Sequence, residues 1–221
     1  MNMPQLILAS QSPRRRELLQ LLELPFEVTP ADLKEAPEPD ETPTELALRL
    51  SRAKAGSVLD SDRDVLVIAC DTIVVLEDGR NQGRVLGKPR DGEEAKLMLR
   101  KLRDRSHRVY SAVTIMDRLG NTATELAETR LTMRPYTMAE LDAYVASGDP
   151  LDKAGAYAIQ HEGFHPVQEI EGCYASVMGL PLCHLTRCLA AHGTSVPVSV
   201  ADACQAHTGH RCEIYPEIIR P

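Results

Sequence analysis

Residues 6–19 read Leu6-Ile-Leu-Ala-Ser-Gln-Ser-Pro-Arg-Arg-Arg-Glu-Leu-Leu19, and this stretch predicts a strand that runs into a helix. Leu6 to Ala9 form an apolar run suited to a buried strand, and Ser12 is expected to cap a helix that begins with proline. The free N–H groups of the helix N-terminus, together with three arginines at 14–16, indicate an anion site. The alternative is a basic helix face that lies in solvent.

Other helix and strand signals indicate an α/β domain. Three capping sequences predict helices from Thr42 to about Val58, from Asp91, and from Thr137 to Gly148. Strand-like runs lie at 65–69, 72–76, 109–116 and 122–133, and the last two are expected to pair around a turn at 117–120. The alternation of strands and helices is typical of an α/β fold, without an internal repeat.

The size and charge of the chain limit the classes of function. With 221 residues and 43% hydrophobic content, it can form one large domain or two lobes around a cleft. A formal net charge of −7 argues against nucleic-acid binding by bulk electrostatics, although a locally positive cleft can take a small anion. No apolar run approaches the roughly 20 residues that span a bilayer, and no signal-peptide pattern is present, so we expect a cytoplasmic protein without membrane contact.

The cysteines and the tail add two expectations. Six irregularly spaced cysteines in a chain of this size are expected to be reduced thiols. The tail lacks clear periodicity, so residues 1–193 are predicted to form the domain and 194–221 a poorly ordered C-terminal extension. The extension contains four residues with metal-ligand chemistry, whose spacing fits none of the usual zinc patterns and favours a loosely packed tail: Cys204, His207, His210 and Cys212.

A single carboxylate interrupts the apolar run Val65-Leu-Val-Ile-Ala-Cys-Asp-Thr-Ile-Val-Val-Leu76. A buried unpaired carboxylate is costly, so Asp71 needs a metal, a cation or hydrogen-bond donors. A metal-bound substrate is one such partner, and a structural arginine is the alternative. Perturbed carboxylates at strand ends are frequent at functional sites.

Three further charged residues and one loop are candidates for a ligand site. Leu86-Gly-Lys-Pro89 fails as a phosphate-binding Walker A loop, because proline stands where the Mg²⁺-binding hydroxyl is required. Lys88 can still contact phosphate, or it can lie in solvent. The same two alternatives, contact with a ligand or exposure to solvent, apply to Lys54 and Glu35. Residues 150–160 are expected to form a loop and a short strand, in which Lys153 lines a cleft and Gln160 suits a nucleobase edge.

Five short motifs follow one another along roughly residues 5–190: Ser10-Gln-Ser-Pro-Arg-Arg15, Asp71-Thr-Ile-Val74, Gly87-Lys-Pro89, Tyr157-Ala-Ile-Gln160 and Gly179-Leu-Pro181. In this order they resemble the Maf family of nucleoside triphosphate pyrophosphatases. The resemblance implies a two-lobed α/β fold with a mixed twisted central sheet, flanking helices and an interlobe cleft, related to the inosine triphosphate pyrophosphatases. It also implies hydrolysis between the α and β phosphates with Mg²⁺ or Mn²⁺, and a homodimer.

The resemblance also assigns roles to the matched positions. Asp71 matches the catalytic carboxylate, and it would hold the metal together with Glu35, although its role as a base or as a metal ligand stays open. The positions linked to substrate choice are Arg14, Thr72 and Gln160. The phosphate-binding positions are Ser10, Arg14, Arg15, Lys54 and Lys88.

The loop Pro-Leu-Asp-Lys-Ala-Gly-Ala-Tyr, which contains Lys153, resembles the branch that acts on dTTP and UTP. Modified pyrimidine nucleotides are further substrates to consider. Two other functions compete with this expectation. One is a nucleotide-binding regulator of septum formation and cell division with weak catalysis. The other is a house-cleaning pyrophosphatase for 7-methyl-GTP or ITP, although the T-x-N-x-x-K motif of the ITP enzymes is absent.

Overall fold

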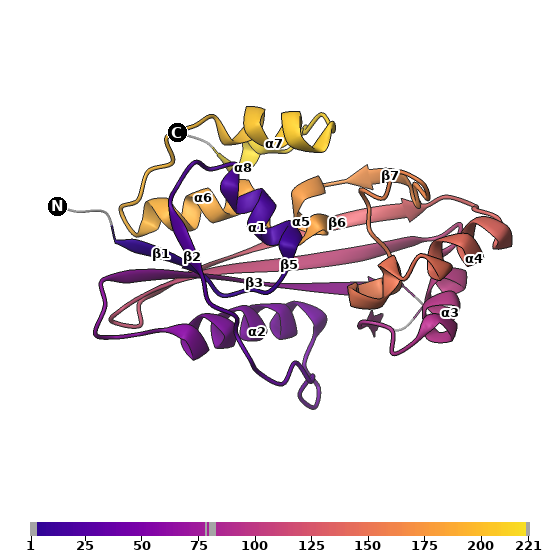
Figure 1. Cartoon of the computed structure of the whole chain (residues 1–221), viewed down its shortest axis with the longest axis horizontal. Helices are drawn as coiled ribbons and strands as arrows, with labels where there is room; N and C mark the ends of the chain where they lie inside the picture. Colours follow the sequence, from indigo (N-terminus) through magenta and orange to yellow (C-terminus); the bar gives the residue numbers. More distant parts are fainter. Residues whose placement is uncertain (1–3, 78, 80–82, 220–221) are drawn as a thin grey trace.

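A mixed β-sheet forms the centre of the computed structural model, which describes residues 4–77, 79 and 83–219 (Figure 1). The described strands follow the order β2-β1-β3-β5-β6-β7, with β4 also paired to β3. The pairs β1–β2 and β1–β3 are parallel and the others are antiparallel. Their bounds are β1 Gln5–Leu8, β2 Phe26–Val28, β3 Val65–Leu76, β4 Arg84–Leu86, β5 Ser106–Asp117, β6 Thr122–Met133 and β7 Val167–Glu171.

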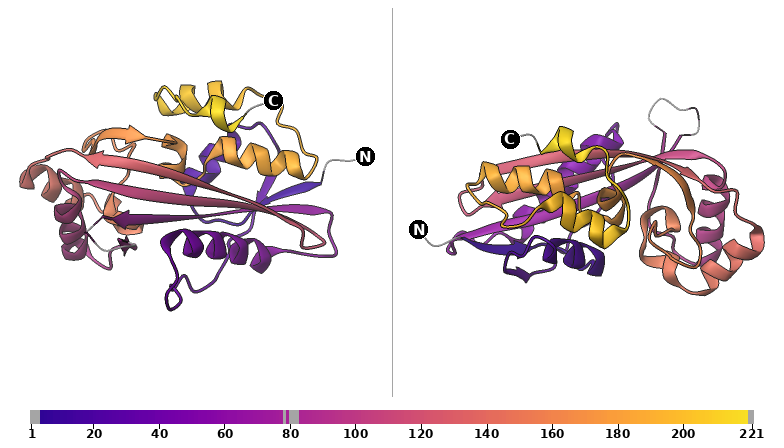
Figure 2. Two further views of the ribbon diagram at one scale, coloured as in Figure 1. Left: turned by 180° about the vertical axis from the view of Figure 1, so that it is seen from behind. Right: turned by 90° about the horizontal axis from the view of Figure 1, so that it is seen from above.

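Helices flank this sheet on both faces, as predicted. Helix α2 lies against one face of β3 and β5, whereas α1, α5 and α6 lie on the other face, and α3 and α4 gather at one end of the long strands (Figures 1 and 2). Within the described residues, no helix is both long and apolar enough to cross a membrane. The helical bounds are α1 Pro13–Gln20, α2 Pro43–Val58, α3 Gly92–Leu102, α4 Met138–Ala146, η1 Asp149–Asp152, η2 Ala154–Ala156, α5 Tyr174–Met178, α6 Leu182–Ala191, α7 Val200–Thr208 and α8 Tyr215–Ile218.

The predicted helix starts are confirmed, because each is fixed by contacts within one turn. The Ser12 hydroxyl accepts from the backbone N–H of Arg15, so α1 begins at the expected proline. Thr42 and Thr137 each form a complete capping box, and Asp91 caps α3. Helix α4 ends at Ala146, two residues before the glycine that was expected to end it.

Strand β3 is continuous over Val65–Leu76, which corrects the expectation of two separate strands. Because successive side chains point to opposite faces, alternate residues of β3 enter different apolar clusters. Leu66 and Ile68 belong to the large cluster on the α1 and α6 face, whereas Val65 and Val67 belong to a smaller cluster on the other face. The carboxylate at position 71 does not break the strand, because it finds a cation from α2.

Two other segments differ from the sequence expectation. Residues 150–160 contain no strand, and instead form the 3₁₀ turns η1 and η2 around Gly155, whose φ is 72°. In the expected loose extension, residues 200–208 form α7, which packs against α5 and α6 through the buried Val200 and Ala201. Apolar burial by a helix end without strong periodicity explains why the pattern alone did not indicate it.

Candidate active site

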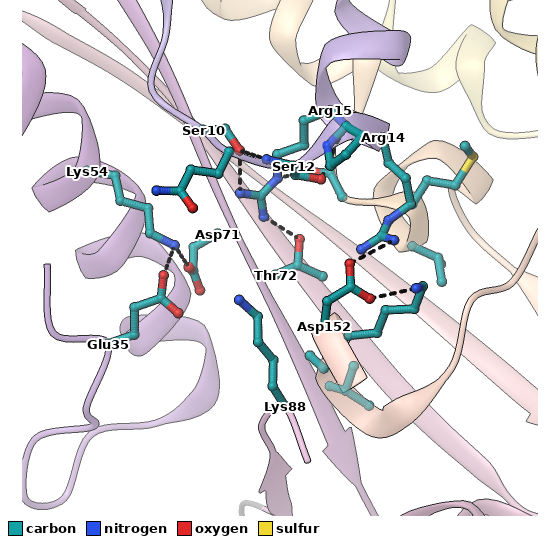
Figure 3. Close-up of a pocket in the computed structure, with 18 of the residues that line it drawn as sticks. Ser10, Ser12, Arg14, Arg15, Glu35, Lys54, Asp71, Thr72, Lys88 and Asp152 are labelled. Carbon is teal, nitrogen blue, oxygen red and sulfur yellow. Dashed lines mark hydrogen bonds and ion pairs between the residues drawn. The ribbon is translucent and has the colours of Figure 1, made fainter. Parts of the chain in front are cut away.

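A cavity of about 460 Å³ lies at a gap in the sheet beside β3. Strand β1 pairs with β3 as far as Ile68, and β4 pairs with the same edge from Val74 onward. Between these two neighbours, Asp71 and Thr72 of β3 face the cavity, which the Ser10–Arg15 turn closes from one side (Figure 3). The cavity brings together all ten residues that sequence reasoning selected: Ser10, Arg14, Arg15, Glu35, Lys54, Asp71, Thr72, Lys88, Lys153 and Gln160.

Two carboxylates converge on one ammonium group at the α2 side of the cavity. Nζ of Lys54 lies 2.5 Å from Oδ1 of Asp71 and 2.5 Å from Oε1 of Glu35 (Figure 3). Lys54 and Asp71 are buried, whereas the Glu35 side chain is 46% exposed. The cation that Asp71 requires therefore comes from α2, 17 residues earlier in the chain. Of the described hydrogen bonds, none engages Oδ2 of Asp71.

The charges around Glu35 favour its ionised form. Partial burial acts to raise the pKa of this carboxyl, but the hydrogen bond from Lys54 and the positive charges of Lys54, Lys88 and Arg15 hold it below its ordinary value. Glu35 therefore carries a negative charge at neutral pH, beside the buried side chain of Asp71.

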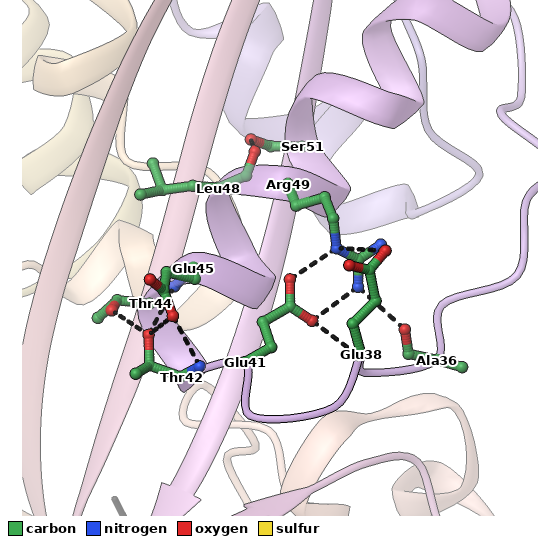
Figure 4. Close-up of polar contacts among 9 residues, drawn as sticks. All are labelled: Ala36, Glu38, Glu41, Thr42, Thr44, Glu45, Leu48, Arg49 and Ser51. Carbon is green, nitrogen blue, oxygen red and sulfur yellow. Dashed lines mark hydrogen bonds and ion pairs between the residues drawn. The ribbon is translucent and has the colours of Figure 1, made fainter.

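An arginine of α2 fixes the loop that carries Glu35. Arg49 donates to both carboxylate oxygens of Glu41, at 2.6 and 2.8 Å, and to the carbonyl of Ala36 at 3.0 Å (Figure 4). This paired hydrogen bond lowers the pKa of Glu41 to about 2. Because Ala36 follows Glu35 directly, α2 holds this loop at two neighbouring points, through Arg49 and Lys54.

Arg15 connects the first turn of α1 to Thr72, on the face of β3 opposite to Asp71. Its Nε donates to the Gly179 carbonyl at 2.9 Å, and its Nη2 donates to the Thr72 hydroxyl at 3.3 Å. Nη1 donates to the buried Ser10 hydroxyl at 3.4 Å. Gly179 has a φ of 115°, and a Cβ there would lie 3.3 Å from Nε of Arg15, so glycine permits this close approach.

Arg14 faces the loop on the far side of the cavity. Its Nη1 lies 3.6 Å from Oδ2 of Asp152, whose other oxygen is 2.6 Å from Nζ of Lys153 (Figure 3). Lys153 also donates to the carbonyl and carboxylate of Asp149, at 2.5 and 3.0 Å. Lys153 thus holds its own loop, while Arg14 has one exposed carboxylate as its partner.

The lining residues fit a divalent cation bound together with a polyanion. Five basic and four acidic side chains line the cavity, so its local charge is almost balanced and a bare triphosphate would stay largely unneutralised. Mg²⁺ is commonly held by one or two carboxylates plus substrate phosphates, which is the donor set that Asp71 and Glu35 offer. Among the residues described, no group of three or more His, Cys, Asp or Glu side chains forms a metal site by itself.

Several residues of the site were not selected from the sequence. Asp152 and Gly179 lie within the quoted motifs and could be found there, but their contacts with Arg14 and Arg15 join segments that are far apart in the chain. Ser111, in the middle of β5, had only the weak signal of a polar residue within an apolar strand. Its hydroxyl lies 2.9 Å from that of Thr72.

The cysteines and the tail lie outside this site. All six cysteines are free, in agreement with the expectation of reduced thiols. His210 stacks on Tyr174 with ring centroids 5.3 Å apart, and the N–H of Cys212 donates to Gln205 at 2.9 Å. In the described part of the tail, the Cys and His residues form no group of three or more potential metal ligands.

Comparison with known proteins shows a family match over most of the chain. Residues 5–192 match the family described as Maf-like protein. A relative from Bacillus cereus (strain ATCC 10987 / NRS 248), named dTTP/UTP pyrophosphatase, is 42% identical over 186 residues, which cover 84% of this chain and 89% of the relative. Relatives of the same name from Carboxydothermus hydrogenoformans and Pelotomaculum thermopropionicum are 45% and 43% identical, over 81% and 88% of this chain and 94% and 100% of their own length.

Among solved structures, a HAM1 protein from Coxiella burnetii is 20% identical, with a TM-score of 0.42 over 70% of this chain and 86% of that chain.

Proposed function

The chain belongs to the Maf-like protein family, and from this premise we propose that it hydrolyses dTTP and UTP to the nucleoside monophosphate and pyrophosphate. The observation that carries the proposal is the Lys54 ammonium between Asp71 and Glu35, in one cavity with Arg14, Arg15 and Lys88. Such a site combines a carboxylate for the reacting centre with cations for a phosphate chain. Relatives named dTTP/UTP pyrophosphatase support the choice of substrate.

Each of three residues has its own role in the proposed hydrolysis. Water attacks the α-phosphorus, the bond to the bridging oxygen of the β-phosphate breaks, and pyrophosphate leaves. Asp71 accepts the proton of the attacking water on Oδ2, the oxygen that Lys54 leaves free. Arg14 exchanges its exposed partner Asp152 for a phosphate oxygen, and Lys88 neutralises the leaving pyrophosphate.

Glu35 and the phosphate oxygens would hold a divalent cation, Mg²⁺ or Mn²⁺, and Asp71 would join them as a ligand only where it is not the base. When bound, the cation would supply positive charge at the α-phosphate. Lys54 stays beside the same two carboxylates and limits their repulsion in the absence of substrate. A cytoplasmic location and a homodimer stay predictions.

The substrate assignment is tested with purified protein, Mg²⁺ or Mn²⁺ and a panel of nucleoside triphosphates, with release of pyrophosphate and monophosphate measured. We expect kcat/KM for dTTP and UTP to exceed that for ATP and GTP at least tenfold, because a purine leaves polar groups around Thr72 and Gln160 unpaired, at about 1 to 3 kcal/mol each. If ITP or 7-methyl-GTP were the best substrate, the preference for pyrimidines would be contradicted, but the proposed pyrophosphatase activity would still hold. Failure to turn over any triphosphate would favour a nucleotide-binding regulator.

The phosphate path is tested with two arginines of one helix. We expect Arg14→Ala to lower kcat/KM about 10- to 100-fold, since hydrogen bonds to charged groups contribute about 1.5 to 3 kcal/mol. Lys88→Ala is expected to act in the same direction, because the Lys88 ammonium points into the cavity (Figure 3). Arg16→Ala is the matched control, since Arg16 is exposed on α1 and does not line the cavity. Equal losses for Arg14 and Arg16 would place the phosphates elsewhere.

A further inference from the structure

One buried hydroxyl beside the cavity has no part in the mechanism above. Ser111 of β5 lies directly opposite Thr72 of β3 in the antiparallel register, and it is fully buried. The two hydroxyl oxygens are 2.9 Å apart, so one of them donates to the other. Which one donates decides what Thr72 can offer to a ligand.

The partners of Ser111 settle the direction of this hydrogen bond. A serine hydroxyl has one proton and two acceptor lone pairs, whereas a backbone carbonyl only accepts. Ser111 lies 2.7 Å from the Ser176 carbonyl and must donate its proton there. Its remaining role toward Thr72 is that of acceptor, so the Thr72 hydroxyl donates to Ser111.

A second set of buried hydrogen bonds surrounds Ser176, the residue whose carbonyl accepts from Ser111. The Ser176 hydroxyl donates to the Cys173 carbonyl at 2.7 Å and lies 2.8 Å from the Thr129 hydroxyl. Thr129 in turn accepts from the Cys173 N–H at 3.0 Å and lies 3.3 Å from the Cys173 carbonyl. Ser176 and Thr129 are fully buried, like Ser111. These contacts hold Ser176 in place, and with it the carbonyl to which Ser111 donates.

Thr72 is therefore an acceptor on the side that faces the cavity. Its proton goes to Ser111, and one lone pair accepts from the guanidinium of Arg15 at 3.3 Å, a group that can only donate. The one bonding position left is a lone pair. Phosphate oxygens are acceptors and gain nothing there, whereas a ligand N–H does.

We infer that Ser111 is a positioning residue that selects a ring N–H at Thr72, the group that uracil and thymine carry at N3. Cytosine has an acceptor at N3, so the lone pair of this nitrogen would face the lone pair of the Thr72 hydroxyl. The inference rests on the proposed function, because it assumes that the base of a nucleoside triphosphate lies against Thr72. It goes beyond that function because it names the base atom that is recognised, N3, and the buried residue that determines this recognition, Ser111.

The test compares UTP with CTP in the full-length protein and in Ser111→Ala. Without Ser111 the Thr72 proton is free to turn toward the cavity and donate to N3 of cytosine. We expect the ratio of kcat/KM for UTP to that for CTP to fall at least about tenfold, mainly through better use of CTP. Ser111→Thr keeps a hydroxyl and is expected to keep the wild-type ratio. A loss of activity caused by general distortion would lower both substrates together and leave the ratio unchanged.

Ser106→Ala is the matched control, because Ser106 lies on the same strand and pairs with the Thr132 hydroxyl at 3.1 Å, but does not line the cavity. Thr72→Val serves as a second variant if Ser111→Ala fails to fold, since it removes the acceptor itself and is also expected to abolish the preference for UTP. An unchanged ratio in either folded variant would overturn the inference.

Binding of the α,β-methylene analogues of UTP and CTP, measured by calorimetry, separates this inference from the proposed function. These analogues are not cleaved between the α and β phosphates. Their binding therefore reports base recognition whether or not the protein hydrolyses triphosphates. A wild-type protein that binds both analogues equally would contradict the role of Ser111. A protein that hydrolyses no triphosphate but binds the UTP analogue more tightly, with the preference lost in Ser111→Ala, would contradict the proposed function alone.

Discussion

Asp71→Asn is expected to lower kcat for dTTP and UTP by about 10²- to 10⁴-fold, the range that a general base contributes. Asparagine has nearly the same shape and can keep an oxygen toward Lys54, so the buried contact at Oδ1 is retained. The substitution removes the negative charge and the ability of Oδ2 to accept a proton. Measurement of pyrophosphate release in single-substrate kinetics gives the effect on kcat separately from that on KM.

The fold of Asp71→Asn is checked by circular dichroism and a thermal melt, because the side chain is buried within the continuous strand β3. Asp32→Asn is the matched control: Asp32 also lines the cavity, but it is exposed and lies outside the Lys54 cluster. We expect the control to stay near wild-type turnover. Near-normal turnover by folded Asp71→Asn would remove Asp71 from the centre of the reaction.

Features that depend on neighbours in the chain could be predicted from the sequence. The caps at Ser12, Thr42 and Thr137 each join residues three positions apart, so the pattern contains both partners. The antiparallel pair β5–β6 follows from two apolar runs joined by a short turn. The motifs could be assigned to one site because each contributes residues that line the same cavity beside β3.

Features that depend on distant partners could not be predicted in this way. The sequence suggested a break in β3 at Asp71, because Lys54, its cation, lies on another element. Residues 150–160 were expected to include a strand, but Lys153 bonds to Asp149 and Asp152 and curls the chain into 3₁₀ turns. The direction of the Thr72 hydroxyl depends on a carbonyl of α5, which pairing pattern and composition do not report.

The two faces of β3 divide the site into two functions. Asp71 points toward α2 and meets Lys54, while its neighbour Thr72 points toward α1 and meets Arg15. One dipeptide thus places the proposed reacting centre and the proposed base contact on opposite sides of one strand. The gap between β1 and β4 is what lets both side chains reach the same cavity.

Lys54→Met is expected to lower kcat/KM by about 10²- to 10³-fold, the loss that follows removal of one preorganised cationic or donor group from a reacting centre. Methionine retains most of the aliphatic stem but leaves Asp71 and Glu35 without the ammonium that both contact at 2.5 Å. Removal of one partner of a fully buried ion pair costs about 3 to 5 kcal/mol of folding free energy, and we expect less here because Glu35 is half exposed. Thermal melts therefore accompany the kinetics, so that activity is expressed per amount of folded protein.

Arg52→Met, an exposed position on the same helix that contacts Thr124, is the matched control and should keep both activity and stability near wild type. Full activity of Lys54→Met would mean that the two carboxylates do not need this cation, and that the bridge in the cavity is structural.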